Sequence, residues 1–349
     1  MAAAHTAKLI DGKKVSAAIL AELKEDIARL RARGIVPGLA VVLVGEDPAS
    51  SIYVRNKRRT CEEIGVASFA HDLPADFPER RLLNLVTKLN EDPRVHGILV
   101  QSPLPAHINE QKVLNAIDPD KDVDGFHPVN KGRLLNGEPC FVACTPAGCQ
   151  ELLLRQGYDP AGKHIVILGR SNIVGKPLAA LLMQKAAGAN ATVTVCHSRT
   201  RRLAAVTREA DILIAAIGVP EFVTPHMVKK GVVVIDVGMN RIPDPSKRSG
   251  HRLVGDVAFE AVRKKARAIT PVPGGVGPMT IAMLMQNTVL AAKRCAGICC
   301  PRSPTAASQK YKADLHARGP CGSAHFSVIG INGGARGRPV FHLRPWGRR

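Results

Sequence analysis

The sequence predicts an α/β protein made of two αβα lobes in series, each built on a parallel sheet. Short runs that are apolar at nearly every position, as in strands buried on both faces, alternate with helical segments. At 349 residues the chain is long enough for about two domains, and 45% hydrophobic with 22% charged residues is a globular composition. A glycine turn between a strand and a helix opens the second half.

The first lobe is predicted to begin with a helix over about 15–33, because apolar residues recur there at helical spacing. Gly34 and Pro37 follow, as they do where helices end. Buried strands are then predicted at 39–45 (LAVVLVG) and 97–101 (GILVQ).

A helix within 144–157 is predicted to connect the first lobe to the second. Residues 1–147 together with 277–296 are assigned to the first lobe, and 148–276 to the second. Residues 297–349 lack apolar periodicity and are predicted to form a poorly ordered basic tail. The strands predicted for the second lobe are 164–169, 192–196, 211–218 and 232–238.

The net charge of +20 raises the alternative of a nucleic-acid-binding protein. The last 53 residues hold nine lysines and arginines but one acid, Asp314, so a large share of this charge belongs to the predicted tail. Aromatic residues make up only 3%, too few for a surface on which bases stack. We therefore expect no nucleic acid as the main partner.

The nine cysteines show no paired CxxC spacing, which favours reduced thiols in a cytoplasmic protein. Cys140, Cys144 and Cys149 are predicted to be buried small apolar residues rather than metal ligands. No apolar run approaches the roughly 20 residues of a membrane span, and no export signal is recognised, so no membrane partner is expected.

The segment HIVILGRSNIVGKP, residues 164–177, predicts a strand, a glycine turn and a helix. The turn runs from Gly169 to Gly175 and has Ser171 where the second glycine of GxGxxG would stand. Because an apolar strand precedes it and further strands follow, the pattern favours dinucleotide binding over a plain structural turn.

The end of the next strand, ATVTVCHSRT, indicates which dinucleotide is bound. NAD is usually held there by an acid, whereas the 2′-phosphate of NADP needs donors and positive charge. Ser198, Arg199 and Thr200 follow this strand without an acid, and Arg170 lies in the glycine turn. The sequence therefore favours NADP, although these arginines could merely face solvent.

Tyr53 and Lys57 are four residues apart, so on a helix their side chains would share a face. Such a pair alone is more often an exposed tyrosine beside a solvated lysine. Gln101 follows a predicted strand, at the edge where open α/β sheets bind ligands.

Asp120, Asp122 and Asp124 suggest a metal site, but their spacing lacks the other positions of a calcium loop and no histidine pair accompanies them. We expect no metal.

The segment ITPVPGGVGPMTIAML, 269–284, has three prolines and three glycines from Pro271 to Pro278. The prolines would hold the chain extended, and the glycines would let backbone approach a flat ligand without obstruction by Cβ atoms. Pro278 can stand in the first turn of a helix, and that helix, about 279–294, is expected to pack back on the first lobe. A rigid interdomain turn without a ligand is the alternative.

These segments together resemble one family. VGEDPASSIYVRNK, VQSPLP, DKDVDGFHPVNKGR, CTPAG, GRSNIVGKP, ATVTVCHS, VIDVGMNR and ITPVPGGVGPMT occur in the order typical of bifunctional methylenetetrahydrofolate dehydrogenase/methenyltetrahydrofolate cyclohydrolases. The resemblance extends from about Ala7 to Arg294. It implies two lobes around a cleft, with folate on the first lobe and NADP on a second, Rossmann-type lobe, and a homodimer.

The resemblance also implies roles for individual residues. Tyr53 and Lys57 would act at the one-carbon centre, Gln101 would position Lys57, and Asp124 would bind the pterin ring. The implied folate contacts are Tyr53, Val54, Arg55, Asn56, Lys57, Val100, Gln101, Ser102, Asp124, Pro273, Gly274, Gly275, Val276 and Gly277. The implied NADP contacts are Gly169, Arg170, Ser171, Val174, Gly175, Ser198, Arg199 and Met239.

Two residues differ from the usual pattern: Ser102 replaces leucine, and Met239 replaces isoleucine, a change that nearly conserves volume. The tail after Arg294 has no recognised counterpart. A family member with only one of the two activities is the nearer alternative, and the nucleic-acid-binding protein is the alternative from a different class.

Overall fold

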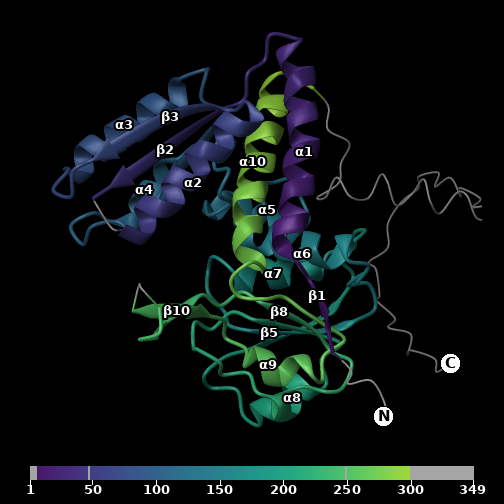
Figure 1. The fold of residues 1–349 in the computed structure, drawn as a ribbon. Coiled ribbons are helices and arrows are strands. Elements are labelled where there is room, and N and C mark those ends of the chain that lie inside the picture. The colour runs from purple at the N-terminus through teal and green to yellow at the C-terminus, as the bar shows by residue number, and fades with distance from the viewer. Residues whose placement is uncertain (1–5, 46–47, 248–249, 299–349) are drawn as a thin grey trace, which may run out of the picture. The chain divides into compact units, whose positions relative to one another are not determined.

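The computed structural model describes residues 6–45, 48–247 and 250–298, all within one compact unit of the chain (Figure 1). Most of the predicted tail, residues 299–349, lies outside these ranges. Its first two residues are described and are ordered: the Ile298 N–H donates to the Lys293 carbonyl at 2.9 Å, and the side chain packs on the core.

The first lobe contains a three-stranded parallel sheet in the order β3-β2-β4. Strands β2 (Gly38–Val44) and β4 (Gly97–Val100) were predicted, and all their residues are buried. Strand β3 (Ala67–Leu73) was not predicted, because as an edge strand it is only half-buried and lacks a continuous apolar run. The lobe's other helices are α2 (Pro48–Ile64), α3 (Glu79–Glu91), α4 (Glu110–Ala116) and α5 (Pro128–Asn136).

Alternate residues of β2 enter two different hydrophobic clusters, as the period of two in a strand requires. Leu39 and Val41 face the cluster that includes α1 (Gly12–Arg31) and α2. Ala40 and Val42 face the cluster formed with α3 and α4. The apolar run at 39–45 is thus explained by helices on both faces of the sheet.

The second lobe contains a six-stranded parallel sheet in the order β1-β11-β8-β7-β5-β6. The predicted strands are found as β5 (His164–Leu168), β6 (Thr192–Cys196), β7 (Ile212–Ala215) and β8 (Val233–Asp236). Strand β6 lies at the edge and is partly exposed, so it does not have the two buried faces its composition predicted. The short strands β1 (Lys8–Leu9) and β11 (Ala268–Ile269) complete the sheet.

Strand β1 departs from the predicted lobe boundaries. Residues 8 and 9 were assigned to the first lobe, yet they pair with Ala268 and Ile269 of the second sheet. A strand of two residues is too short to be recognised from a sequence pattern. An antiparallel pair, β9 (Asn240–Pro243) and β10 (His251–Val254), was also missed, because its burial is only partial.

The chain crosses over β5 when it passes from β6 to β7, so the direction of strand addition reverses between β5 and β7. Ligands of open α/β sheets bind outside the carboxyl ends of the strands at such a point. The loops that follow β5 and β7 are therefore the expected place for a dinucleotide. Helices α6 (Cys144–Arg155), α7 (Gly175–Leu182), α8 (Leu203–Arg208) and α9 (Phe259–Arg263) and the 3-10 turn η1 (Pro225–Met227) flank the sheet.

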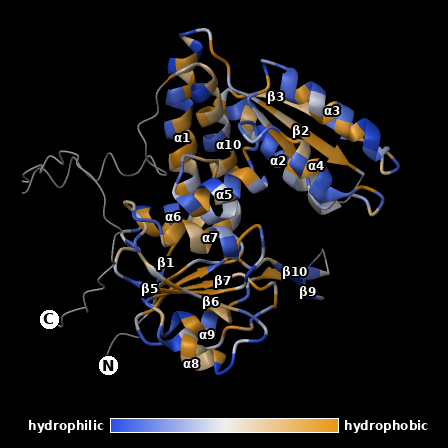
Figure 2. Cartoon of the chain, turned by 180° about the vertical axis from the view of Figure 1, so that it is seen from behind, coloured by the Kyte–Doolittle hydropathy of each residue, from blue (hydrophilic) through white to orange (hydrophobic). Residues whose placement is uncertain are grey.

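Helices α1 (Gly12–Arg31) and α10 (Val276–Cys295) lie side by side (Figure 1). Helix α10 packs on α1, α2 and α6, so the prediction that this helix returns to the first lobe is confirmed. The ion pair from Lys293 Nζ to Asp26 Oδ2 spans 2.7 Å between the two helices. In Figure 2 the strands are mainly hydrophobic and the helices have mixed faces, as a layered α/β protein requires. Within the described residues, no helix has both the length and the apolar character needed to cross a membrane.

The first residue of α1 directly touches residues 273–277, called the glycine loop below. The Gly12 N–H donates to the Gly274 carbonyl at 3.0 Å, and a Cβ on Gly12 would lie 1.7 Å from the Gly275 oxygen. Gly12→Ala must therefore displace backbone. We expect it to lower the free energy of unfolding by roughly 1–3 kcal/mol, the usual cost of overpacking, as measured by thermal melting.

Gly132→Ala is the matched control for that substitution. Gly132 is in helix α5, with no atom within 4 Å of the added Cβ. Alanine there should stabilise the protein by roughly 0.5–1 kcal/mol through helix propensity. Equal melting temperatures for the two variants would contradict the contact between Gly12 and the glycine loop.

Candidate functional site

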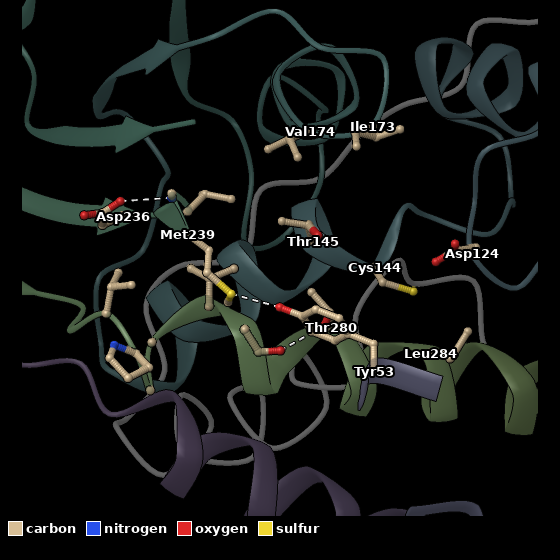
Figure 3. Close-up of a pocket in the computed structure, with 18 of the residues that line it drawn as sticks. Tyr53, Asp124, Cys144, Thr145, Ile173, Val174, Asp236, Met239, Thr280 and Leu284 are labelled. Atoms are coloured by element: carbon tan, nitrogen blue, oxygen red, sulfur yellow. Dashed lines mark hydrogen bonds between the residues drawn. The ribbon is translucent and has the colours of Figure 1, made fainter. Parts of the chain in front are cut away.

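A cavity of about 410 Å³ is lined by residues of both lobes (Figure 3). The first lobe contributes a face of α2, the end of β4 and the segment around Asp124. The second contributes the glycine turn and the loop after β8. The lining residues are Tyr53, Lys57, Gln101, Asp124, Phe126, Cys144, Thr145, Ile173, Val174, Asp236, Val237, Gly238, Met239, Pro271, Val272, Pro273, Gly274, Gly275, Val276, Gly277, Thr280 and Leu284.

Tyr53 and Lys57 both line the cavity from α2, as their spacing of four predicted. Lys57 Nζ donates to Gln101 Oε1 at 2.9 Å, and Gln101 Nε2 donates to the Ser102 carbonyl at 2.7 Å. The two bonds orient the Gln101 amide so that its oxygen faces the lysine. The amine is therefore held by a residue 44 positions away in the sequence.

The Tyr53 hydroxyl donates to Met239 Sδ at 2.8 Å, across the cavity between the two lobes (Figure 3). The structure shows the bond to the Lys57 amine for Gln101, the residue that the resemblance implied. Burial raises the pKa of Tyr53, with Arg241 opposing the shift, so the hydroxyl is protonated at neutral pH and can donate.

Asp124 and Cys144 lie near each other on the side of the cavity that faces Lys57 (Figure 3). Burial raises the pKa of Asp124, and the nearby Lys57 opposes that shift. Burial also raises the pKa of the Cys144 thiol well above its usual range. The Cys144 Sγ donates to the Val123 carbonyl at 3.6 Å, which is the role of an unreactive buried thiol rather than of a nucleophile.

The glycine loop presents backbone to the cavity, as the bare sequence from Pro273 to Gly277 predicted. Gly274 has φ of +106°, a conformation that favours glycine. At Gly275 a Cβ would lie 2.6 Å from the Pro271 carbonyl oxygen, so a side chain cannot be accommodated there without movement. Helix α10 begins at Val276, and Pro278 falls in its first turn, where its missing N–H has no intrahelical acceptor.

Five of the predicted folate contacts do not line the cavity with their side chains. Val54 is 2% exposed and packs in the core, because it is one step around α2 from Tyr53. Val100 is buried in the cluster on the α3 and α4 side. The Ser102 hydroxyl donates to Glu110 Oε1 at 2.9 Å. Arg55 is exposed and Asn56 is half-buried, both away from the lining. Their contacts with folate remain predictions.

The three aspartates of DKDVD have separate surroundings. Asp120 pairs with Arg133 at 3.3 Å, and Asp124 lines the cavity. Asp122 is buried and accepts the N–H groups of Phe126 at 3.1 Å and His127 at 2.8 Å. Within the described ranges no group of three or more acids, histidines or cysteines could hold a metal ion.

The glycine turn is closely packed. A Cβ on Gly169 would lie 2.1 Å from the Ala216 carbonyl oxygen, and one on Gly175 would lie 2.2 Å from the Gly169 oxygen. Ser171, in the place of the second glycine, accepts the Val174 N–H at 3.1 Å through its hydroxyl. Glycine is therefore required at both ends of the turn, as the close strand-to-helix packing of a dinucleotide-binding turn demands.

The candidate 2′-phosphate residues lie beside this turn but outside the cavity. Strands β5 and β6 are neighbours, and the Gly169 N–H donates to the Cys196 carbonyl at 2.9 Å. Arg170 follows one strand, Ser198 and Arg199 follow the other, and all three are exposed. The structure thus brings these donors to adjacent strand ends, with no acid at either end.

Several lining residues were not predicted, among them Phe126, Thr145, Asp236 and Thr280. Each lies within or beside a segment whose pattern was recognised, so the segment was found but not the side chain. Thr280 donates to the Gly277 carbonyl at 2.8 Å and closes the first turn of α10. No local pattern distinguishes such a residue from an ordinary helix start.

A Rossmann-type lobe that shares a cavity with a lobe presenting a lysine, a glutamine and an aspartate defines a two-lobed, dinucleotide-dependent oxidoreductase. Residues 10–124 match the catalytic domain of the tetrahydrofolate dehydrogenase/cyclohydrolase family, and residues 143–296 match its NAD(P)-binding domain. The chain belongs to this family, and the resemblance of its motifs is confirmed.

Relatives agree over most of their length. The bifunctional protein FolD of Moorella thermoacetica is 59% identical over 288 residues, which is 82% of this chain and 99% of the relative. That of Chlorobium phaeovibrioides is 61% identical over 284 residues, 80% of this chain and 96% of the relative.

Solved structures are similar too. The bifunctional enzyme from Campylobacter jejuni has a TM-score of 0.78 at 50% identity, over 82% of this chain and 99% of that one. The Trypanosoma brucei enzyme, solved with NADP and an inhibitor, has a TM-score of 0.78 at 43% identity, over 83% and 99%.

Proposed function

We propose that this chain oxidises 5,10-methylenetetrahydrofolate with NADP and hydrolyses the methenyl product to 10-formyltetrahydrofolate. The observation that carries the proposal is the shared cavity. Lys57, held by Gln101, lines the same space as the glycine loop and the Val237–Met239 segment that follows β8. A single bound folate there would meet an amine and a dinucleotide site at once.

For the oxidation, NADP supplies the hydride acceptor and the protein supplies alignment. The ring nitrogen of the folate can stabilise the cationic product, so no protein base is required. The glycine turn and the loops after β7 and β8 would orient the dinucleotide, and the backbone of the glycine loop would support the flat folate. Holding two reacting carbons in register is a major source of rate in such a step.

For the hydrolysis, proton transfers are required. Water that attacks the methenyl carbon must lose a proton, and a ring nitrogen must later gain one. Lys57 Nζ is the candidate to carry it, because the Gln101 oxygen fixes its position at 2.9 Å. Asp124 and Tyr53 line the same cavity, where the carboxyl group would bind the pterin and the hydroxyl would contact the one-carbon unit.

The test is to measure both activities on the full chain. Purified protein should show a rise in NADPH absorbance that depends on methylenetetrahydrofolate, and separately a loss of methenyltetrahydrofolate absorbance without NADP. One activity without the other would identify a monofunctional member. Salt-dependent retention on DNA by residues 1–296 without the basic tail, with neither activity, would favour the nucleic-acid-binding alternative.

NADP selectivity provides a finer test. Arg170→Gln with Arg199→Gln should raise the Michaelis constant for NADP by roughly tenfold or more per arginine, because charge-assisted bonds to phosphate are worth about 1.5–3 kcal/mol. The constant for NAD should change little. Arg80→Gln, an exposed arginine in α3, is the control. Equal changes for the two cofactors would reject the assignment.

We also propose a homodimer in the cytoplasm. The cysteines of the described ranges are free thiols, which is consistent with a reducing compartment. The dimer rests on the family resemblance. Sedimentation that finds only a monomer at micromolar concentration would contradict it.

A further inference from the structure

Two carboxylates are buried behind the dinucleotide side of the cavity. Asp236 ends strand β8, lines the cavity and is 2% exposed. Asp256 follows strand β10 and is fully buried, at 0% exposure. In the described part of the chain neither forms an ion pair, so their burial is costly unless hydrogen bonds compensate it.

Asp256 holds the loops after β7 and β8. Its Oδ2 accepts the N–H groups of Ile217 at 2.7 Å and Gly218 at 3.0 Å. Its Oδ1 accepts a bond of 2.9 Å from the side-chain amide of Asn240. Ile217 and Gly218 directly follow Ala216, whose carbonyl oxygen packs closely against Gly169 of the glycine turn.

Asp236 continues the same network. Its Oδ1 accepts the N–H groups of Gly238 at 3.0 Å and Asp256 at 2.9 Å, and its Oδ2 accepts that of Val257 at 3.0 Å. Burial raises the pKa of Asp236 to about 7, with the backbone N–H groups opposing the shift. The loop after β8 is thereby bonded to the segment that carries Asp256.

Two glycines pack tightly against the carboxylates of Asp236 and Asp256. A Cβ on Gly238 would lie 2.2 Å from Asp256 Oδ1, and a Cβ on Gly255 would lie 1.8 Å from Asp236 Oδ2. The carboxylates therefore define where these backbone segments lie. The cavity is lined by the segment between Asp236 and Asn240, which consists of Val237, Gly238 and Met239.

We propose that Asp256, which does not line the cavity, is a positioning residue for hydride transfer, fixing the loops after β7 and β8 against the reacting end of the dinucleotide. The proposal rests on the proposed function. It assigns no part in the hydrolysis, because Lys57, Gln101 and Asp124 belong to the other lobe.

Asp256→Ala removes the acceptor for the Ile217 and Gly218 N–H groups. We expect kcat/KM for NADP in the dehydrogenase reaction to fall roughly 100-fold, as a misplacement of about 1 Å can cause. Cyclohydrolase activity without NADP should stay within about threefold of the parent, since Lys57 keeps its bond to Gln101 and only the bond from Tyr53 to Met239 reaches the displaced loop. Asp256→Asn keeps an amide oxygen for the two N–H groups, and the Asn240 amide can turn to accept from it. This variant should recover most of the dehydrogenase activity.

Val262→Ala is the control for general destabilisation. Val262 is fully buried in α9 of the same lobe and does not line the cavity. If circular dichroism shows that Asp256→Ala does not fold, Asn240→Ala takes its place. This variant removes only one donor to Asp256. Its dehydrogenase activity should fall about tenfold, because one hydrogen bond to a charged group is lost. The proposal is overturned if Asp256→Ala keeps its dehydrogenase activity. It is also overturned if Asp256→Ala loses both activities in parallel, and Val262→Ala, when equally destabilised, does the same.

Calorimetry with NADP alone separates this inference from the proposed function. If the parent binds NADP but has neither activity, the proposed function fails. The positioning role still predicts weaker NADP binding in Asp256→Ala than in Asp256→Asn. Equal dissociation constants for the two variants would overturn it.

Discussion

Replacing Lys57 by methionine is expected to abolish the hydrolysis of methenyltetrahydrofolate and to leave hydride transfer reduced but detectable. General acid–base catalysis contributes about 10²–10⁴-fold, so the hydrolysis should fall by that order when the amine is removed. Methionine keeps the length and the apolar stem of lysine. Hydride transfer depends on the alignment of two carbons. Its rate should therefore fall only by the amount that the amine contributed to folate binding.

Arg59→Met is the matched control, because it removes a cation from the same helix. Arg59 is largely exposed, with 70% of its side chain accessible, and pairs with Glu63 at 3.3 Å. Both activities should be retained in this variant. If folded Lys57→Met protein, still able to bind NADP, hydrolyses methenyltetrahydrofolate at the parent rate, Lys57 is not the acid–base group.

Gly175→Ala is expected to lower the dehydrogenase activity and to spare the cyclohydrolase activity, the reverse of Lys57→Met. The new Cβ would lie 2.2 Å from the Gly169 oxygen and 2.9 Å from the Arg170 Cα, so the glycine turn must open. Both contacts are with backbone, which cannot move aside as a flexible side chain can. A displaced helix start would misplace the dinucleotide, and kcat/KM for NADP should fall roughly 100-fold. Cyclohydrolase activity should be nearly unchanged.

The control is Gly132→Ala, which makes the same chemical change on a helix with open space around it. Steady-state kinetics in both reactions and calorimetry with NADP provide the measurements. Parallel losses of the two activities in Gly175→Ala would indicate global unfolding instead of a local effect. Unchanged NADP binding would show that the turn does not hold the dinucleotide.

The elements that could be predicted from the sequence are those whose pattern reflects their own burial. Strands β2, β4, β5, β7 and β8 are apolar at nearly every position because helices cover both faces. Helix α1 repeats its apolar residues every three or four positions because one face is buried. Strand β3 and the β9–β10 pair are partly exposed and carry no such pattern.

The site divides in the same way. Tyr53 and Lys57 share a face because both belong to one helix, and the glycine turn could be recognised from the strand and helix on either side. The residues between Tyr53 and Lys57 could not be assigned to a face, since spacing alone does not say which of Val54, Arg55 and Asn56 faces the core.

By itself the sequence determined the fold class, the order of the buried strands, the glycine turn and, through its motifs, the family. Only the tertiary structure decided that Tyr53 bonds to Met239, a residue 186 positions away, whereas the bond between Gln101 and Lys57 had been implied by the resemblance. The tertiary structure also decided that β1 joins the second sheet and that Asp256 holds the loops after β7 and β8. Periodicity records the burial of each segment on its own, whereas these contacts depend on how separate segments pack, to within an ångström, against one another.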